Sequence, residues 1–138
     1  MMSSWVIRPR RWLYYKDGEQ YFKTALNAAQ KRAEIFTPEI LYNLTAMAIE
    51  KYLMAFLMYH NDLADNHTMR DMIDSVERHG KMPEALVAKL LYLDSFQEIC
   101  DMDSYNRTAP RREDLPLILA AGEEVKAFVN QRIEVTPN

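Results

Sequence analysis

Residues 38–60 read PEILYNLTAMAIEKYLMAFLMYH, and this stretch decides the fold class. Apolar residues recur in it at three- and four-residue steps and cover more than half of the circumference of a helix. Thr37 is a good N-cap, Pro38 fits the first helical position, and Glu39 favours the positive end of the helix dipole. The stretch therefore predicts a long, central helix from Pro38 to His60.

Helical patterns also occupy the chain on both sides of this central segment. Apolar stripes predict a helix over residues 17–36, a shorter one over 68–79, another over 83–101, and a last one that Asp114 caps. Short polar or proline-containing connections separate them. We therefore expect an all-α fold, an antiparallel up-and-down bundle of four to five helices. The bundle should span residues 17–133, followed by a frayed C-terminal tail over 134–138.

Composition excludes several classes of protein. The 138 residues suit one domain, and the three glycines occur at neither of the spacings that phosphate-cradling loops require. A single cysteine, Cys100, cannot form an internal disulfide, which fits a reducing cytoplasm. The net charge of -3 argues against bulk DNA binding. The chain has no run of 18 consecutive apolar residues, so we expect no membrane span, and from the single cysteine we expect a cytoplasmic protein.

The first 16 residues form a basic and aromatic segment without an acidic side chain before Asp17. Pro9 opposes a long helix there, so we interpret the segment as an irregular arm. Its side chains either pack on the domain or a second copy, or meet phosphates and bases. The candidates for a partner interface are Trp5, Arg8, Arg10, Arg11 and Trp12.

An arginine-bearing loop before the last helix is the best local candidate for binding a nucleotide or another phosphate. Arginines fork onto phosphate oxygens, a tyrosine can stack on a base, and a helix N-terminus attracts anions. Glu113 and Asp114 compete for the same arginines. The candidate residues are Tyr105, Arg107, Arg111 and Arg112.

Histidines and carboxylates crowd residues 60–71 and raise the question of a metal site. His67 with two of the carboxylates would be such a site. The alternative is a polar turn in which Asp or Asn caps the next helix. The pattern favours the turn, and we predict neither a metal nor a cofactor.

Residues 48–55, AIEKYLMA, are similar to the Ala-x-Glu-Lys-x-Leu-Lys-Ala signature of the HEPN domain family. His67-Thr68-Met69 resembles the start of that family's third helix, and Ser104-Tyr105-Asn106 stands where members often have Arg-Tyr-Pro. The positions that carry the resemblance are Glu50, Lys51, His67 and Tyr105. The chain departs from the pattern at Met54, Thr68 and Ser104.

The resemblance implies a four- or five-helix bundle that forms homodimers, often beside small nucleotidyltransferases, in toxin–antitoxin modules or in RNA-targeting defence systems. Active HEPN members are metal-independent ribonucleases, in which four to six residues separate an arginine from a histidine. Here no arginine precedes His60, His67 or His79 at that spacing. We therefore predict no catalytic residue.

The leading hypothesis is a non-catalytic, HEPN-like binding or regulatory module. It would form a homodimer and contact a nucleotide, RNA or a neighbouring protein such as a nucleotidyltransferase. One alternative is a divergent metal-independent ribonuclease, with His67 and an arginine from another helix. The other is a dimerisation module with a purely structural role.

Overall fold

The computed structural model describes residues 2–31, 36–64, 66, 68–96 and 109–133, with side chains from residue 11 onward. Within these ranges the chain is helical and contains no β-strand, which confirms the all-α prediction. The helices are α1 (Met2–Lys31), α2 (Pro38–Tyr59), α3 (Met69–Glu77), α4 (Glu84–Asp94) and α5 (Leu115–Arg132), with a short 3-10 turn, η2 (Arg112–Asp114), before α5.

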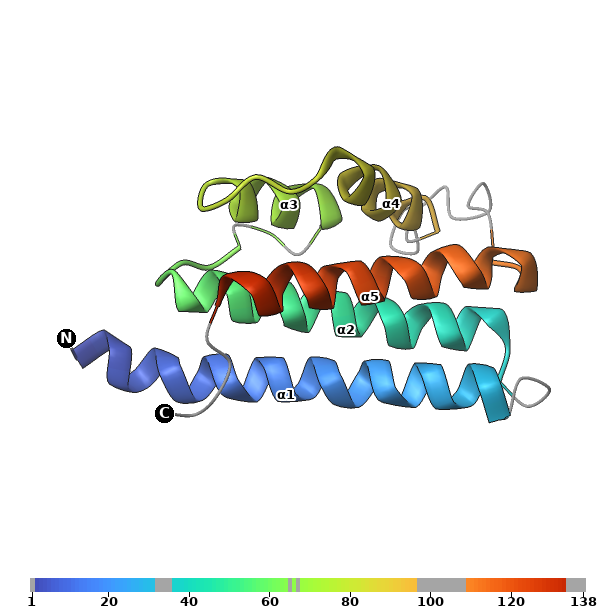
Figure 1. Cartoon of the computed structure of the whole chain (residues 1–138), viewed down its shortest axis with the longest axis horizontal. Coiled ribbons are helices and arrows are strands. Elements are labelled where there is room, and N and C mark those ends of the chain that lie inside the picture. The colour runs from blue at the N-terminus through green and yellow to red at the C-terminus, as the bar shows by residue number, and fades with distance from the viewer. Residues whose placement is uncertain (1, 32–35, 65, 67, 97–108, 134–138) are drawn as a thin grey trace.

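The three long helices, α1, α2 and α5, lie side by side, and the shorter α3 and α4 cover one side of them (Figure 1). Helix α1 runs opposite to both α2 and α5. Helix α4 also runs opposite to α2, because the Tyr42 hydroxyl near the start of α2 donates to the Leu93 carbonyl near the end of α4 at 2.9 Å. The predicted up-and-down bundle is therefore confirmed.

The prediction of an irregular N-terminal arm is wrong, because α1 runs through Pro9 as a continuous helix. The missing amide of Pro9 removes one helical hydrogen bond. Buried side chains continue along α1 on the N-terminal side of Asp17, where Arg11 and Tyr15 pack against α2. Together with Phe22, these residues are buried at helical spacing. The predicted end at Phe36 also differs, since this residue lies in a bend. The predicted tail, 134–138, lies outside the described residues.

Two glycines allow the long helices to approach closely. A β-carbon at Gly122 would lie 2.5 Å from the Phe22 ring, and one at Gly18 would lie 3.1 Å from the Tyr52 ring. Phe22 and Tyr52 are themselves buried, so neither ring has room to move away. Glycine is thus required at Gly122 for α1 to pack on α5.

Local capping chemistry fixes the starts of α2 and α3. The Thr37 hydroxyl accepts the Ile40 amide at 3.2 Å, as the sequence predicts. Helix α3 is capped by Thr68, whose hydroxyl accepts the Asp71 amide at 3.1 Å, and not by the expected Asp or Asn. Helix α4 begins beside Pro83, close to its predicted start.

Helix α2 is long and apolar enough to cross a membrane by length and composition alone. However, 67% of its most apolar window is buried inside the bundle. Tyr52, Leu53 and Leu57 are among its fully buried residues. This burial is typical of the core helix of a soluble bundle.

Candidate functional site

Helices α2, α3 and α5 end on the side of the bundle where α1 begins (Figure 1), and basic residues stand at or just after each of these three helix ends. We call this region the basic end and define it by His60, Arg78, His79 and Arg132. His60 follows the last residue of α2, Arg78 and His79 follow α3, and Arg132 is the last residue of α5. Helix C-termini present unpaired carbonyls and favour cations, which explains this placement.

Aromatic contacts join His60, His79 and Arg132 into one cluster. The rings of His60 and His79 are stacked, with centroids 4.6 Å apart and planes at 9°. Phe56 lies beneath them, 4.7 Å from the His60 ring and 5.5 Å from Phe128. The Arg132 guanidinium lies 4.1 Å from the Phe128 ring centroid. The basic end therefore rests on a rigid aromatic base within the core.

Asp62 anchors two members of the basic end. Its Oδ2 atom accepts a hydrogen bond from Arg78 Nη2 at 2.9 Å and contacts His79 Nε2 at 2.7 Å. Burial alone would raise the pKa of Asp62, but the hydrogen bonds from His79 and Arg78 outweigh it and lower the pKa to about 2. Asp62 is thus a fixed anion at neutral pH that orients Arg78 and His79.

His60 resists protonation in this environment. Burial lowers its pKa, and the positive charge of a protonated His79 lowers it further, while Asp62 acts in the opposite direction. Two stacked imidazoles cannot both become charged without repulsion. A bound anion would relieve that repulsion, so the stack is a natural place for a phosphate to change the protonation of a histidine.

The predicted partner-interface residues have different outcomes. Arg11 is buried in its own chain, with its guanidinium 5.0 Å from the Tyr59 ring centroid, so it is not an exposed contact for a partner. Trp12 is half-buried against the core. The side chains of Trp5, Arg8 and Arg10 lie outside the described part of the chain.

The arginine-bearing loop is only partly described, since Tyr105 and Arg107 lie outside the described residues. Arg111 contacts Glu113 Oε1 at 3.3 Å and Asp114 Oδ2 at 3.8 Å. The Asp114 carboxylate also accepts the Arg111 amide and the Tyr92 hydroxyl, each at 2.9 Å. The Arg111 amide is the main cause that lowers the pKa of Asp114. The competition that the sequence predicted is therefore present, and it engages Arg111 at the start of α5.

Arg112, the fourth loop candidate, is exposed at the start of η2. The family-motif residues Glu50 and Lys51 are half-buried in the middle of α2. The Lys51 ammonium lies 5.0 Å from the Tyr14 ring centroid. His67 and Tyr105, the other two family-motif positions, lie outside the described residues. Of the four family-motif positions, the described residues therefore show the places of Glu50 and Lys51 alone.

A polar network that the sequence did not reveal links the buried Tyr15 and Tyr52 to partly exposed side chains at the edge between α1, α2 and α5. Glu19 accepts the Tyr52 hydroxyl and pairs with Lys126 Nζ at 3.1 Å. The Tyr15 hydroxyl donates to the Asn130 side chain, and burial raises the pKa of Tyr15. These partners lie far apart in the chain, so no spacing in the sequence could have indicated them.

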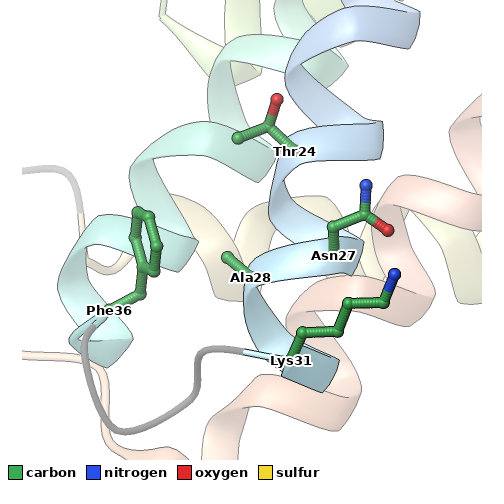
Figure 2. Close-up of a pocket in the computed structure, with 5 residues that line it drawn as sticks. All are labelled: Thr24, Asn27, Ala28, Lys31 and Phe36. Carbon is green, nitrogen blue, oxygen red and sulfur yellow. The ribbon is translucent and has the colours of Figure 1, made fainter.

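The outer side of α1 and α2 carries two shallow hollows. One, of about 350 Å³, is lined by Leu13, Tyr14, Asp17, Lys51 and Met58. Figure 2 shows the other, of about 250 Å³, with Phe36 beside the start of α2 and Ala28 on α1. Among the described residues, no three histidine, cysteine or acidic side chains are placed to hold a metal ion.

Comparison with known proteins finds no relative: no protein-family model, curated protein or solved structure matches this chain. The function must therefore be inferred from the chain's own geometry.

Proposed function

We propose that this chain is a non-catalytic, HEPN-like binding module that takes RNA or nucleotide phosphates at its basic end. One observation carries the proposal: three helix ends bring the His60–His79 stack and Arg132 onto Phe56 and Phe128, and Asp62 ties Arg78 to His79. The single cysteine fits a cytoplasmic setting, and the family resemblance adds a neighbouring nucleotidyltransferase as a candidate protein partner.

The chemistry of the basic end suits a phosphodiester. A guanidinium offers paired donors that match phosphate oxygens, and the Arg78 side chain is 44% exposed. Arg132 is also exposed. His79 supplies a ring nitrogen, and Tyr59, which is 39% exposed with its ring 5.2 Å from that of His60, is the aromatic side chain that a base can reach. Asp62 holds Arg78 and His79 in place until a phosphate competes for the same donors.

Binding to a labelled single-stranded RNA tests the proposal by fluorescence anisotropy at low salt. Arg78→Ala and Arg132→Ala should each weaken binding about tenfold, because a hydrogen bond to a charged group contributes roughly 1.5–3 kcal/mol. Each substitution should also reduce the salt dependence by about one counterion. The matched controls, Arg111→Ala and Arg112→Ala, should keep the affinity.

Two results would reject the proposal. Equal affinity for the wild type and both basic-end variants would exclude this site, and a loss confined to the Arg111 and Arg112 variants would move binding to the loop. Circular dichroism of every variant separates a lost contact from a lost fold.

The His79–Asp62 contact favours a second candidate function, the divergent metal-independent ribonuclease. A carboxylate 2.7 Å from an imidazole orients the ring for proton transfer, as general acid–base catalysis requires. Incubation of transfer RNA and mixed RNA with the purified protein decides between the two functions. Cleavage that disappears in His79→Ala would establish the enzyme, and intact RNA with both proteins would support binding alone.

A further inference from the structure

A hollow between α1 and α5 includes part of the polar network and shares no residue with the basic end. Its volume is about 410 Å³, within the roughly 300–1,000 Å³ that is typical of small-molecule sites. Helix α1 supplies most of its lining and α5 supplies one residue: Glu19, Gln20, Phe22, Lys23, Leu26 and Lys126. Charged and apolar side chains therefore meet in one hollow.

The apolar part of the hollow is fixed by the packing of α1 on α5. Phe22 is only 2% exposed and its ring lies against Gly122, so it backs the hollow and cannot move away. Leu26, four positions further along α1, is half-buried and packs on the same core. Leu26 is thus the apolar side chain that an occupant can cover, and the methylene stems of the two lysines add to it.

The Glu19 carboxylate is held through one of its two oxygens. Its Oε1 atom accepts the Tyr52 hydroxyl and pairs with Lys126 Nζ at 3.1 Å. Burial alone would lower the pKa of Lys126, but the hydrogen bond and the charge of Glu19 outweigh it and raise the pKa. Lys126 is therefore a fixed cation at neutral pH, and its ammonium keeps donors that Glu19 does not use.

Lys23 lies one turn after Glu19 on α1 but does not pair with it. A glutamate and a lysine four residues apart share a helix face and can form an ion pair. Glu19 instead meets Tyr52 and Lys126, and among the described residues Lys23 makes no hydrogen bond or ion pair. Glu123 also acts on Lys126 but does not line the hollow. Two ammoniums and one carboxylate thus line it, which leaves one positive charge to neutralise.

We infer that this hollow binds a small organic carboxylate with an apolar body. The carboxylate meets Lys23 and the remaining donors of Lys126, and the apolar body covers Leu26. One negative charge neutralises the hollow, whereas a phosphate dianion brings a second negative charge beside Glu19. The inference is independent of RNA binding, since the residues of the hollow and of the basic end are different.

Titration of the isotope-labelled protein with phenylacetate, followed by NMR amide shifts, tests the inference. Phenylacetate should bind with millimolar affinity and shift the amides around Glu19, Lys23 and Lys126. Acetate, which lacks the apolar body, and 2-phenylethanol, which lacks the charge, should each bind at least about tenfold more weakly. Phenyl phosphate should also bind more weakly than phenylacetate, and tighter binding of the phosphate would overturn the choice of a carboxylate.

Variants at Lys23 test the site itself. Lys23→Gln should weaken phenylacetate binding about tenfold, because it removes a charged hydrogen bond, and Lys23→Arg should keep the affinity. Lys16→Gln makes the same charge change at an exposed position of α1 outside the hollow and should have no effect. Absence of binding at every concentration would overturn the inference, as would equal affinity of the wild type and Lys23→Gln. Equal binding of phenylacetate and 2-phenylethanol, or amide shifts confined to the basic end, would also overturn it.

Discussion

The two ends of the bundle hold their arginines in different ways. At the basic end, Arg78 follows the end of α3 and Arg132 is the last residue of α5, and the Arg132 guanidinium lies over the Phe128 ring. At the opposite end, Arg111 precedes α5 and is engaged by Glu113 and Asp114. Before α5, Glu113 and Asp114 balance the charges of Arg111 and Arg112. At the basic end a single carboxylate, Asp62, pairs with both Arg78 and His79, so the residues that define that end keep a net positive charge beside Asp62.

Charge reversal at each end gives the largest expected effect. The Arg78→Glu/Arg132→Glu variant should lose RNA affinity about 100-fold, since two contacts of at least about 1.4 kcal/mol each are removed and replaced by repulsion. The Arg111→Glu/Arg112→Glu variant should change affinity less than about threefold. Electrophoretic mobility shifts with the same RNA measure both, and equal losses would erase the distinction between the ends.

A substitution in the interior between the two ends should change the free energy of unfolding but not the affinity for RNA. Gly122→Ala forces a methyl group to within 2.5 Å of the Phe22 ring. Overpacking of this kind costs about 1–3 kcal/mol of the free energy of unfolding. Urea denaturation should show this loss, while RNA affinity of the folded variant stays unchanged. Wild-type stability in this variant would contradict the close packing of α1 on α5.

The two carboxylates that hold the arginines should separate the ends again. Asp114→Asn should lower the free energy of unfolding slightly, because it weakens the acceptor for the Arg111 amide and the Tyr92 hydroxyl. It should not change RNA affinity.

Asp62→Asn should instead strengthen RNA binding, since Arg78 and His79 lose a competing anion. Fluorescence anisotropy measures the RNA affinity and urea denaturation measures the free energy of unfolding, on the same preparations of each variant. Weaker RNA binding by the folded Asp62→Asn protein would show instead that the site needs the Asp62 carboxylate to hold Arg78 and His79 in place.

The smallest expected effect is a dependence of stability on pH at the basic end. Because burial lowers the pKa of His60, the unfolded chain binds more protons than the folded chain just below about pH 6.5. The free energy of unfolding should therefore fall as the pH drops from 7 to 5. Asp62 does not contribute in this window, since its pKa is lowered and its stabilisation is lost only below about pH 4.

His60→Gln should show a flatter profile than the wild type in urea denaturation at several pH values. The same slope in both proteins would show that the stacked His60 ring is not the group responsible. His79→Gln is the matched control for removal of the stack itself.

The fold could be predicted wherever the signal was local. Thr37, Pro38 and the apolar stripe of α2 act within one or two turns, so the sequence alone fixed the start of that helix. Pro9 indicated a break in the helix, and that prediction was wrong. The packing of Arg11 and Tyr15 against α2 outweighs the local free-energy cost of a proline inside a helix. Tertiary contacts outweighed the local preference.

The candidate site was harder to predict, because sequence patterns point to residues that are neighbours in the chain. The basic end instead joins residues from separate helices. Arg107, Arg111 and Arg112 stand together in the sequence, yet Arg111 is engaged by adjacent acids. His60 and His79 follow two different helices and stack directly, and Phe56 and Phe128 join them to Arg132 on a third helix. No periodicity within one helix encodes such a meeting.

The most direct test of phosphate binding at the basic end is a titration of the isotope-labelled protein with a short single-stranded RNA, followed by NMR amide shifts. The account predicts that the largest shifts fall on His60, Arg78, His79 and Arg132. It also predicts small shifts around Arg111 and Arg112. Shifts concentrated at Arg111 and Arg112, with the basic end unchanged, would contradict it.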